Sequence, residues 1–135
     1  MALITWTDKM SVGIAKIDKE HQGLVELLNT LHSEMLAGRG KDVLGPTLTK
    51  LIRYTQTHFA GEEVLFRIHA YPQAADHKKE HDAFAAKAKA LEADFKSGKA
   101  AITSDLMNFL RDWLTKHILG ADMQYKPYFA QKGLK

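Results

Sequence analysis

Seven side chains that can bind a metal ion occur at helical spacings in this 135-residue sequence. They are five histidines and two carboxylates, namely His21, His58, His77, His81, His117, Glu62 and Asp122. Residues four apart lie on the same face of a helix, so His58 pairs with Glu62. His77 and His81 form a second pair at the same spacing. Imidazole and carboxylate groups repeated in this way predict one buried metal centre.

The number of candidate ligands favours two metal ions over one. A single zinc ion needs about four ligands and would leave several buried polar groups unpaired, at about 1 to 3 kcal/mol each. Five imidazoles, two bridging carboxylates and one bridging oxygen fill all but one position around two six-coordinate ions. Octahedral sites that are rich in nitrogen and free of thiolate suit iron, although copper or zinc would compete on affinity alone and the cellular supply must decide.

Asp122 departs from the regular spacing, because it follows His117 by five residues. Five steps of about 100° leave the two side chains about 140° apart on a regular helix. Gly120 lies between them and favours either a local π-type turn or a looser helix. We therefore expect a helix irregularity from Ile118 to Asp122 that returns the carboxylate to the histidines.

Apolar residues at spacings of three and four predict the helices that position these groups. The first helix is expected from about Lys19 to Leu36, and the second from the region of Leu44 to the Tyr71-Pro72 break. The start of the second helix has two alternatives, because Gly45-Pro46 can open it or lie in its first turn after Asp42.

Two further helices follow the Tyr71-Pro72 break. Pro72 is expected to open the third helix, which ends at Ser97-Gly98. The fourth starts near Thr103 or Ser104, either of which can cap its free amide groups, and Pro127 closes off any extension. Four amphipathic helices joined by short loops predict an all-α, antiparallel up-down-up-down four-helix bundle.

This topology brings the candidate ligands to one end of the bundle. His21 and His77 lie near the starts of the first and third helices, whereas His58 and His117 lie near the ends of the second and fourth. In an up-down-up-down arrangement these four positions share one depth. We expect the extended N-terminal arm, from Ala2 to Asp18, to pack outside the bundle.

Composition restricts the remaining possibilities. Apolar residues at 45% and charged residues at 26% are typical of a globular protein, and we expect one domain over residues 1–135. The absence of cysteine excludes disulfides, thiolate metal sites and thiol nucleophiles. No apolar stretch approaches the roughly 18 to 20 residues of a membrane span, and the start of the chain does not resemble a signal peptide, so we expect a cytoplasmic protein with no membrane insertion.

The charge pattern does not favour nucleic-acid binding. The net charge is only +3, and lysines such as Lys78, Lys79, Lys87 and Lys89 alternate with acids and alanines. We interpret them as a solvated helix face, and we expect a monomer.

The residues that carry these patterns resemble the hemerythrin family, in particular its single-domain bacterial form, over nearly the whole chain. The matching stretches are Trp6, Ile17-Asp18-Lys19-Glu20-His21, His58-Phe59-Ala60-Gly61-Glu62-Glu63, Tyr71-Pro72, His77, His81, Trp113-Leu114-Thr115-Lys116-His117-Ile118 and Asp122. The resemblance implies a four-helix bundle with a non-haem di-iron centre that binds dioxygen.

The resemblance also implies a role for each ligand. It assigns His77, His81 and His117 to one iron, and His21 and His58 to the other. Glu62 and Asp122 would bridge the two irons together with an oxo or hydroxo group. Dioxygen would bind end-on, as a hydroperoxide, at the iron with only two histidines.

A set of apolar residues resembles the family's oxygen pocket: Leu28, Phe59, Trp113, Leu114 and Ile118. Spacing alone would make them ordinary core residues. Because no titratable group stands beside the open position, little would deliver the protons that cleave a bound peroxide, and reversible release is favoured.

Two histidines outside the ligand set, His32 and His69, are interpreted as structural, whereas two departures from the family pattern bear on pocket shape, oxygen affinity and autoxidation rate. The sequence departs from the usual pattern at Phe66, where many relatives carry methionine, and at Ala70, where glycine is common, but neither is a ligand position. His32 lies about 16 Å along the helix from His21, too far to join the same centre. His69 ends the second helix, where a partly charged imidazole meets the helix dipole favourably.

Three main functions are compatible with such a centre, and iron storage or detoxification is a further alternative for which two ions per chain give a poor capacity. The leading hypothesis is a dioxygen-binding protein, not an enzyme, for storage, delivery or local buffering, with an oxygen-consuming enzyme as a possible recipient. The alternatives are an oxygen or redox sensor, and an enzyme that reduces peroxide or nitric oxide. An enzyme would need electron and proton supply, for which the sequence offers no cofactor motif or relay.

Overall fold

The computed structural model describes residues 3–98, 101 and 104–135, and every regular element in this part of the chain is helical. A short 3-10 turn, η1, spans Asp8–Met10 and precedes the main helices. The helices are α1 (Ala15–Leu36), α2 (Lys41–Ile68), α3 (Ala74–Lys96), α4 (Ser104–Lys116), the π-helical segment η2 (His117–Asp122) and α5 (Met123–Gln131). The expectation of an all-α protein is confirmed.

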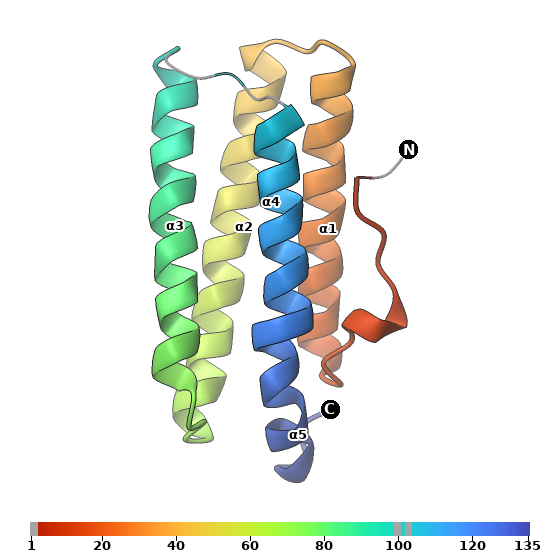
Figure 1. The fold of residues 1–135 in the computed structure, drawn as a ribbon, viewed down its shortest axis with the longest axis vertical. Helices are drawn as coiled ribbons and strands as arrows, with labels where there is room; N and C mark the ends of the chain where they lie inside the picture. The colour runs from red at the N-terminus through yellow and green to blue at the C-terminus, as the bar shows by residue number, and fades with distance from the viewer. Residues whose placement is uncertain (1–2, 99–100, 102–103) are drawn as a thin grey trace.

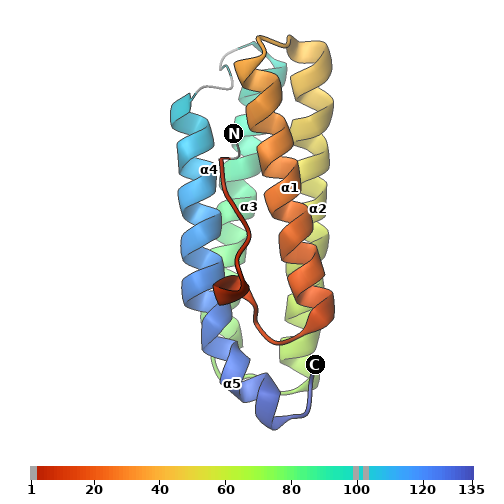
Figure 2. The ribbon, with the colours of Figure 1, turned by 90° about the vertical axis from the view of Figure 1, so that its right-hand side faces the viewer.

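The helices α1, α2, α3 and α4 run in alternately opposite directions, which confirms the up-down-up-down bundle, and η2 and α5 continue from α4 (Figure 1). The N-terminal arm lies along the outside, over α1 and α4 (Figure 2). It is held there because the Ile4 amide donates to Asn29 Oδ1 at 3.0 Å, while Asn29 Nδ2 donates to the Ile4 carbonyl at 2.9 Å. No helix in the described residues has the length and apolar character needed to cross a membrane.

The arm is shorter than expected, because α1 begins at Ala15 and not near Lys19. Ile17 lies one turn before His21 and is only 3% exposed, so the apolar stripe extends a turn further toward the N-terminus. Asp18, expected in the arm, lies in the first turn and accepts a hydrogen bond of 2.8 Å from the amide of Val12.

The starts of α2 and α3 also differ from expectation. α2 begins at Lys41, after Gly40, so Gly45-Pro46 neither opens the helix nor lies in its first turn. Burial of the flanking stripe residues Leu44 and Leu48 accounts for the helix continuing through the proline. α3 begins at Ala74, two residues after Pro72. Thr103, expected as a cap of α4, lies outside the described residues.

The expectation that Pro127 closes off any extension is wrong, because α5 runs through it to Gln131. A proline inside a helix costs about 3 kcal/mol. Tyr125 and Phe129 in the same helix are both 0% exposed, and complete burial of an aromatic side chain contributes about 1.5 to 3 kcal/mol. Packing of these two rings therefore offsets the proline.

The apolar core consists of two clusters. The larger fills the bundle on the side of the α1–α2 loop and includes Leu31, Leu48 and Met107, whereas the smaller fills the side of α5 and includes Phe66 and Phe129. Along α2 the order is Ile52 in the first cluster, then the polar pair His58 and Glu62, then Phe66 in the second. The polar side chains thus lie between two apolar clusters of the core.

Candidate metal centre

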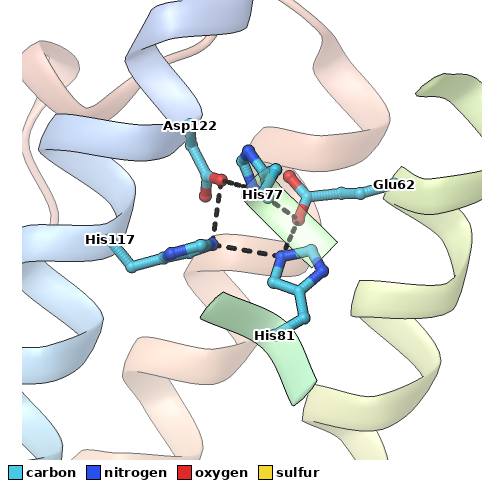
Figure 3. Close-up of side chains that lie close together, drawn as sticks. All are labelled: Glu62, His77, His81, His117 and Asp122. Carbon is cyan, nitrogen blue, oxygen red and sulfur yellow. Dashed lines mark hydrogen bonds and ion pairs between the residues drawn. The ribbon is translucent and has the colours of Figure 1, made fainter. Parts of the chain in front are cut away.

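All seven predicted ligand residues are brought together at one depth of the bundle. α1 contributes His21, α2 contributes His58 and Glu62, α3 contributes His77 and His81, and the π segment contributes His117 and Asp122. None is more than 3% exposed. Figure 3 shows five of them facing a common centre.

The side chains form two groups that share only their carboxylates. One group consists of Glu62, Asp122, His77, His81 and His117, and the other of Glu62, Asp122, His21 and His58. Within each group the nearest ligand atoms all lie within 4.8 Å of one another. The geometry therefore describes two adjacent positions for a cation, with three and two imidazoles, bounded on both sides by the same two carboxylates.

The predicted helix irregularity is confirmed. The helix is π-helical from His117 to Asp122, and the wider turn places Asp122 Oδ1 at 3.1 Å from His117 Nε2. The carboxylate also lies 2.8 Å from His77 Nε2 and, through Oδ2, 3.0 Å from His21 Nε2. Gly120 does not have a positive φ, so the turn does not depend on the conformational freedom of glycine.

Three carboxylates outside the predicted set fix the orientation of the imidazoles. His58 Nδ1 donates to Glu20 at 2.6 Å, His81 Nδ1 to Glu63 at 2.9 Å, and His117 Nδ1 to Glu80 at 3.2 Å. Each acid directly precedes or follows a ligand on its own helix and supports a histidine on the next helix. The spacing of the ligands in the sequence does not identify these three acids, because other surface acids also lie next to such residues.

The inward nitrogens of His81 and His117 lie 3.2 Å apart. When both imidazoles are neutral and Nδ1 carries the hydrogen, their two Nε2 atoms present lone pairs to each other. Glu62 Oε1 adds a carboxylate oxygen at 3.2 Å from His81 Nε2. Acceptors directed at acceptors in a dry interior require positive charge between them, either protons or metal ions.

The pKa values of His58, His117 and Asp122 also indicate that the site favours positive charge on its imidazoles and negative charge on its carboxylate. Burial lowers the pKa of His117, but the hydrogen bond and charge of Asp122 and the charge of Glu62 outweigh it and raise the pKa to about 9. Burial likewise opposes a raised pKa at His58, where Glu62 and Glu20 prevail. Burial favours a higher pKa at Asp122, but hydrogen bonds from the surrounding imidazoles hold it well below its usual range.

Tyr125 is a further buried residue of the site that the analysis of spacing missed. It is 0% exposed, and its hydroxyl donates to Glu62 Oε2 at 2.5 Å. Burial first, and then the charges of Glu62 and Asp122, raise the pKa of Tyr125 well above its ordinary value. The phenol therefore keeps its proton and orients the carboxylate.

The donor set fits a pair of divalent metal ions. Apart from ion-pair contacts among the ligands themselves, several buried atoms that face the centre have no hydrogen-bond partner among the described residues: His21 Nε2, His58 Nε2, His77 Nε2, Glu62 Oε1 and both oxygens of Asp122. A buried polar atom without a partner costs about 1 to 3 kcal/mol. Imidazole and carboxylate together, without thiolate, form a set typical of iron, copper, nickel or zinc.

The predicted pocket residues border the centre on its apolar side. Leu28, Trp113 and Leu114 line a cavity of about 20 Å³, whose remaining walls are Leu24, Leu51, Thr55, Phe84 and Leu110. The Thr55 hydroxyl donates to the Leu51 carbonyl at 2.7 Å, so this hydroxyl proton is not free to face the cavity.

Phe59 and Ile118 do not line this cavity. Phe59 stacks on the ring of His81 with the centroids 3.8 Å apart, and Ile118 is 0% exposed in the core. Trp113 stacks on His117 in the same manner, at 4.6 Å. These rings hold ligand imidazoles in place from the apolar side.

His32 and His69 belong to neither group of metal-binding side chains. His69 ends α2, with its ring 5.6 Å from that of Phe129. Of the two departures from the family pattern, Phe66 contacts a ligand, since its ring lies 4.7 Å from that of His77. Ala70 has φ +52°, a left-handed conformation in which glycine is favoured.

Comparisons with known proteins agree with this geometry. Residues 12–129 match the family described as the hemerythrin HHE cation binding domain. The chain is 34% identical to the bacteriohemerythrin of Stenotrophomonas maltophilia (93% of this chain, 80% of the relative) and 34% identical to that of Methylococcus capsulatus (94% and 97%). A crystal structure of wild-type hemerythrin has 34% identity and a TM-score of 0.88, covering 93% of this chain and 97% of that one.

Proposed function

Because the chain belongs to the hemerythrin family, we propose that its buried cluster holds a non-haem di-iron centre and that the protein binds dioxygen reversibly. The observation that carries the proposal is the pair of ligand groups that share only Glu62 and Asp122. One cation would leave part of this set unpaired, whereas two cations use all of it.

In this proposal His77, His81 and His117 bind one iron, and His21 and His58 bind the other. Glu62 and Asp122, which belong to both ligand groups, would be shared between the two ions, with an oxo or hydroxo group as a third shared ligand. When bound, the ferrous pair supplies an open coordination position and the electrons that hold dioxygen there. The half with two imidazoles has fewer protein ligands, so the open position belongs to it.

The chain's own residues favour release of dioxygen over its reduction. Leu28, Trp113 and Leu114 line a mostly apolar cavity, and the hydroxyl of Thr55 in its wall donates to the Leu51 carbonyl. Tyr125 retains its proton because burial and the charge of Glu62 raise its pKa. Few protons are thus offered to a bound ligand, and proton transfer is what further reduction requires.

An anaerobic titration tests the proposal. The protein loaded with ferrous iron should contain two ions per chain, develop visible colour when air is admitted and lose it when oxygen is removed. Irreversible oxidation at first contact with air would contradict reversible binding. One ion per chain would contradict the di-iron centre.

A turnover assay separates the carrier from the enzyme. The loaded protein, supplied with a reductant and either peroxide or nitric oxide, is expected to consume neither at more than a trace rate. Sustained consumption would assign the cluster to catalysis. A carrier of this kind would serve storage, delivery or local buffering, for example for an oxygen-consuming enzyme.

A further inference from the structure

The imidazoles of the two halves of the cluster are supported unequally. In the three-histidine half, His81 donates its outer hydrogen bond to Glu63, and His117 donates to Glu80. In the two-histidine half, only His58 has such a partner, Glu20. His21 is 1% exposed, and its Nδ1 has no hydrogen-bond partner among the described residues.

This inequality follows from the order of the helices. Each acid on one helix supports a histidine on the helix that follows it in the chain: Glu20 of α1 supports α2, Glu63 of α2 supports α3, and Glu80 of α3 supports the segment after α4. His21 lies on α1, the first long helix, so the series has no earlier member to support it.

A carboxylate on Nδ1 has two effects on a metal-binding histidine. It fixes the tautomer and the orientation of the ring, and it makes the inward Nε2 a stronger donor. Loss of such a partner typically lowers metal affinity by about 10- to 100-fold. The shortest of the three contacts is His58 to Glu20, at 2.6 Å, compared with 2.9 Å to Glu63 and 3.2 Å to Glu80.

The acids differ in exposure. Glu20 and Glu63 are 27% and 28% exposed, whereas Glu80 is 52% exposed, so water weakens the influence of Glu80 on His117. The two-histidine half therefore has fewer ligands and depends on one partly buried acid.

We propose that Glu20 is the positioning residue on which metal binding in the two-histidine half depends, acting through His58. The inference rests on the proposed two-metal function. Glu63 and Glu80 act in the same manner on the other half, but there two supported imidazoles and a third ligand, His77, share the task.

Titration with cobalt(II) alone tests the proposal, because the absorption of cobalt(II) reports its coordination and the ion does not require anaerobic handling. Wild-type protein freed of metal should bind two ions. Glu20→Gln keeps an oxygen acceptor but removes the charge, and it should weaken binding of the second ion 10- to 100-fold while the first binds as in the wild type. Glu26→Gln, the matched charge change on the same helix, should leave both affinities unchanged.

A second variant and a spectrum distinguish positioning from a general loss of structure. Glu63→Gln should change the cobalt(II) bands of the first ion to bind, whereas Glu20→Gln should change only those of the second. Retention of the first ion by Glu20→Gln shows that the fold is intact.

Two results would overturn the inference: two ions bound by Glu20→Gln with wild-type affinity, or equal weakening of both ions in that variant. If the wild type itself binds a single ion, the two-metal function fails, and the inference fails with it for that separate reason.

Discussion

Tyr125 and Glu62 are 63 residues apart in the sequence and meet through a hydrogen bond in the dry interior between α5 and α2. The phenol is the donor, and the carboxylate is one of the two groups shared by both metal positions. The contact ties the C-terminal helix to the centre of the site.

Replacement Tyr125→Phe should therefore destabilise the protein by about 1.5 to 3 kcal/mol, because a buried carboxylate oxygen loses its donor. Urea unfolding measures this change. Tyr128→Phe is the control, since the Tyr128 hydroxyl donates to backbone carbonyls of His69 and Ala70 near the surface, and it should cost less. A smaller loss for Tyr125→Phe than for the control would contradict the assigned role.

The stability of the metal-free protein should decrease as the pH rises from about 6.5 to about 9. The pKa of His117 is raised to about 9 from its ordinary 6.5. Its protonated imidazole therefore contributes its full stabilisation below pH 6.5, and this contribution is lost as the pH rises through about 9. A shift of this size corresponds to about 3 kcal/mol. The lowered pKa of Asp122 acts in the acid range instead.

Urea unfolding at pH 6, 7.5 and 9.5 checks this dependence. Protein loaded with metal is the control, because the ions replace the protons and its stability should change much less over the same interval. A metal-free protein that becomes more stable toward pH 9 would refute the assignment to His117.

Ala70→Gly should stabilise the protein by about 1 kcal/mol. The left-handed conformation costs a non-glycine residue about 1 to 2 kcal/mol, which glycine avoids. Part of this stabilisation is lost because glycine has greater conformational freedom in the unfolded chain. Thermal unfolding measures the shift. Ala86→Gly, at an exposed position inside α3, should have the opposite sign, with a loss of about 0.5 to 1 kcal/mol.

Gly120→Ala should preserve the π segment and its metal content. Nothing lies within 4 Å of a Cβ added at Gly120, and its φ is not positive. Alanine should therefore raise stability by about 0.4 to 1 kcal/mol, through reduced freedom of the unfolded chain. Loss of metal in this variant would show that the wide turn needs glycine after all.

The helical bundle and the depth of the seven ligand residues could be predicted because they follow from periodicity. His58 and Glu62 lie on an apolar stripe, and opposite directions of successive helices bring such positions to one end. The irregularity before Asp122 could be predicted because a spacing of five does not fit a regular helix. In these cases local pattern and tertiary structure agree.

The outer carboxylates and Tyr125 could not be found by the same reasoning. Glu20 and Glu63 lie off the apolar stripes and are partly exposed, so in the sequence they are indistinguishable from ordinary surface acids. Tyr125 lies beyond Asp122, near the point where Pro127 was expected to close off any extension of the helix. Packing against distant segments, which a periodic pattern does not encode, decides the position of each.

Glu20, Glu63 and Glu80 each accept a hydrogen bond from a histidine on the following helix. The correct alignment of each of these helices therefore depends on the alignment of its neighbour. If one helix shifted by one turn, about 5.4 Å, its own imidazole would leave the centre. The acid that orients the imidazole of the following helix would be displaced with it. One error would then displace the histidines of two helices. Metal content is therefore a sensitive measure of correct assembly. Partly misaligned chains should show reduced metal content before they show reduced helical content.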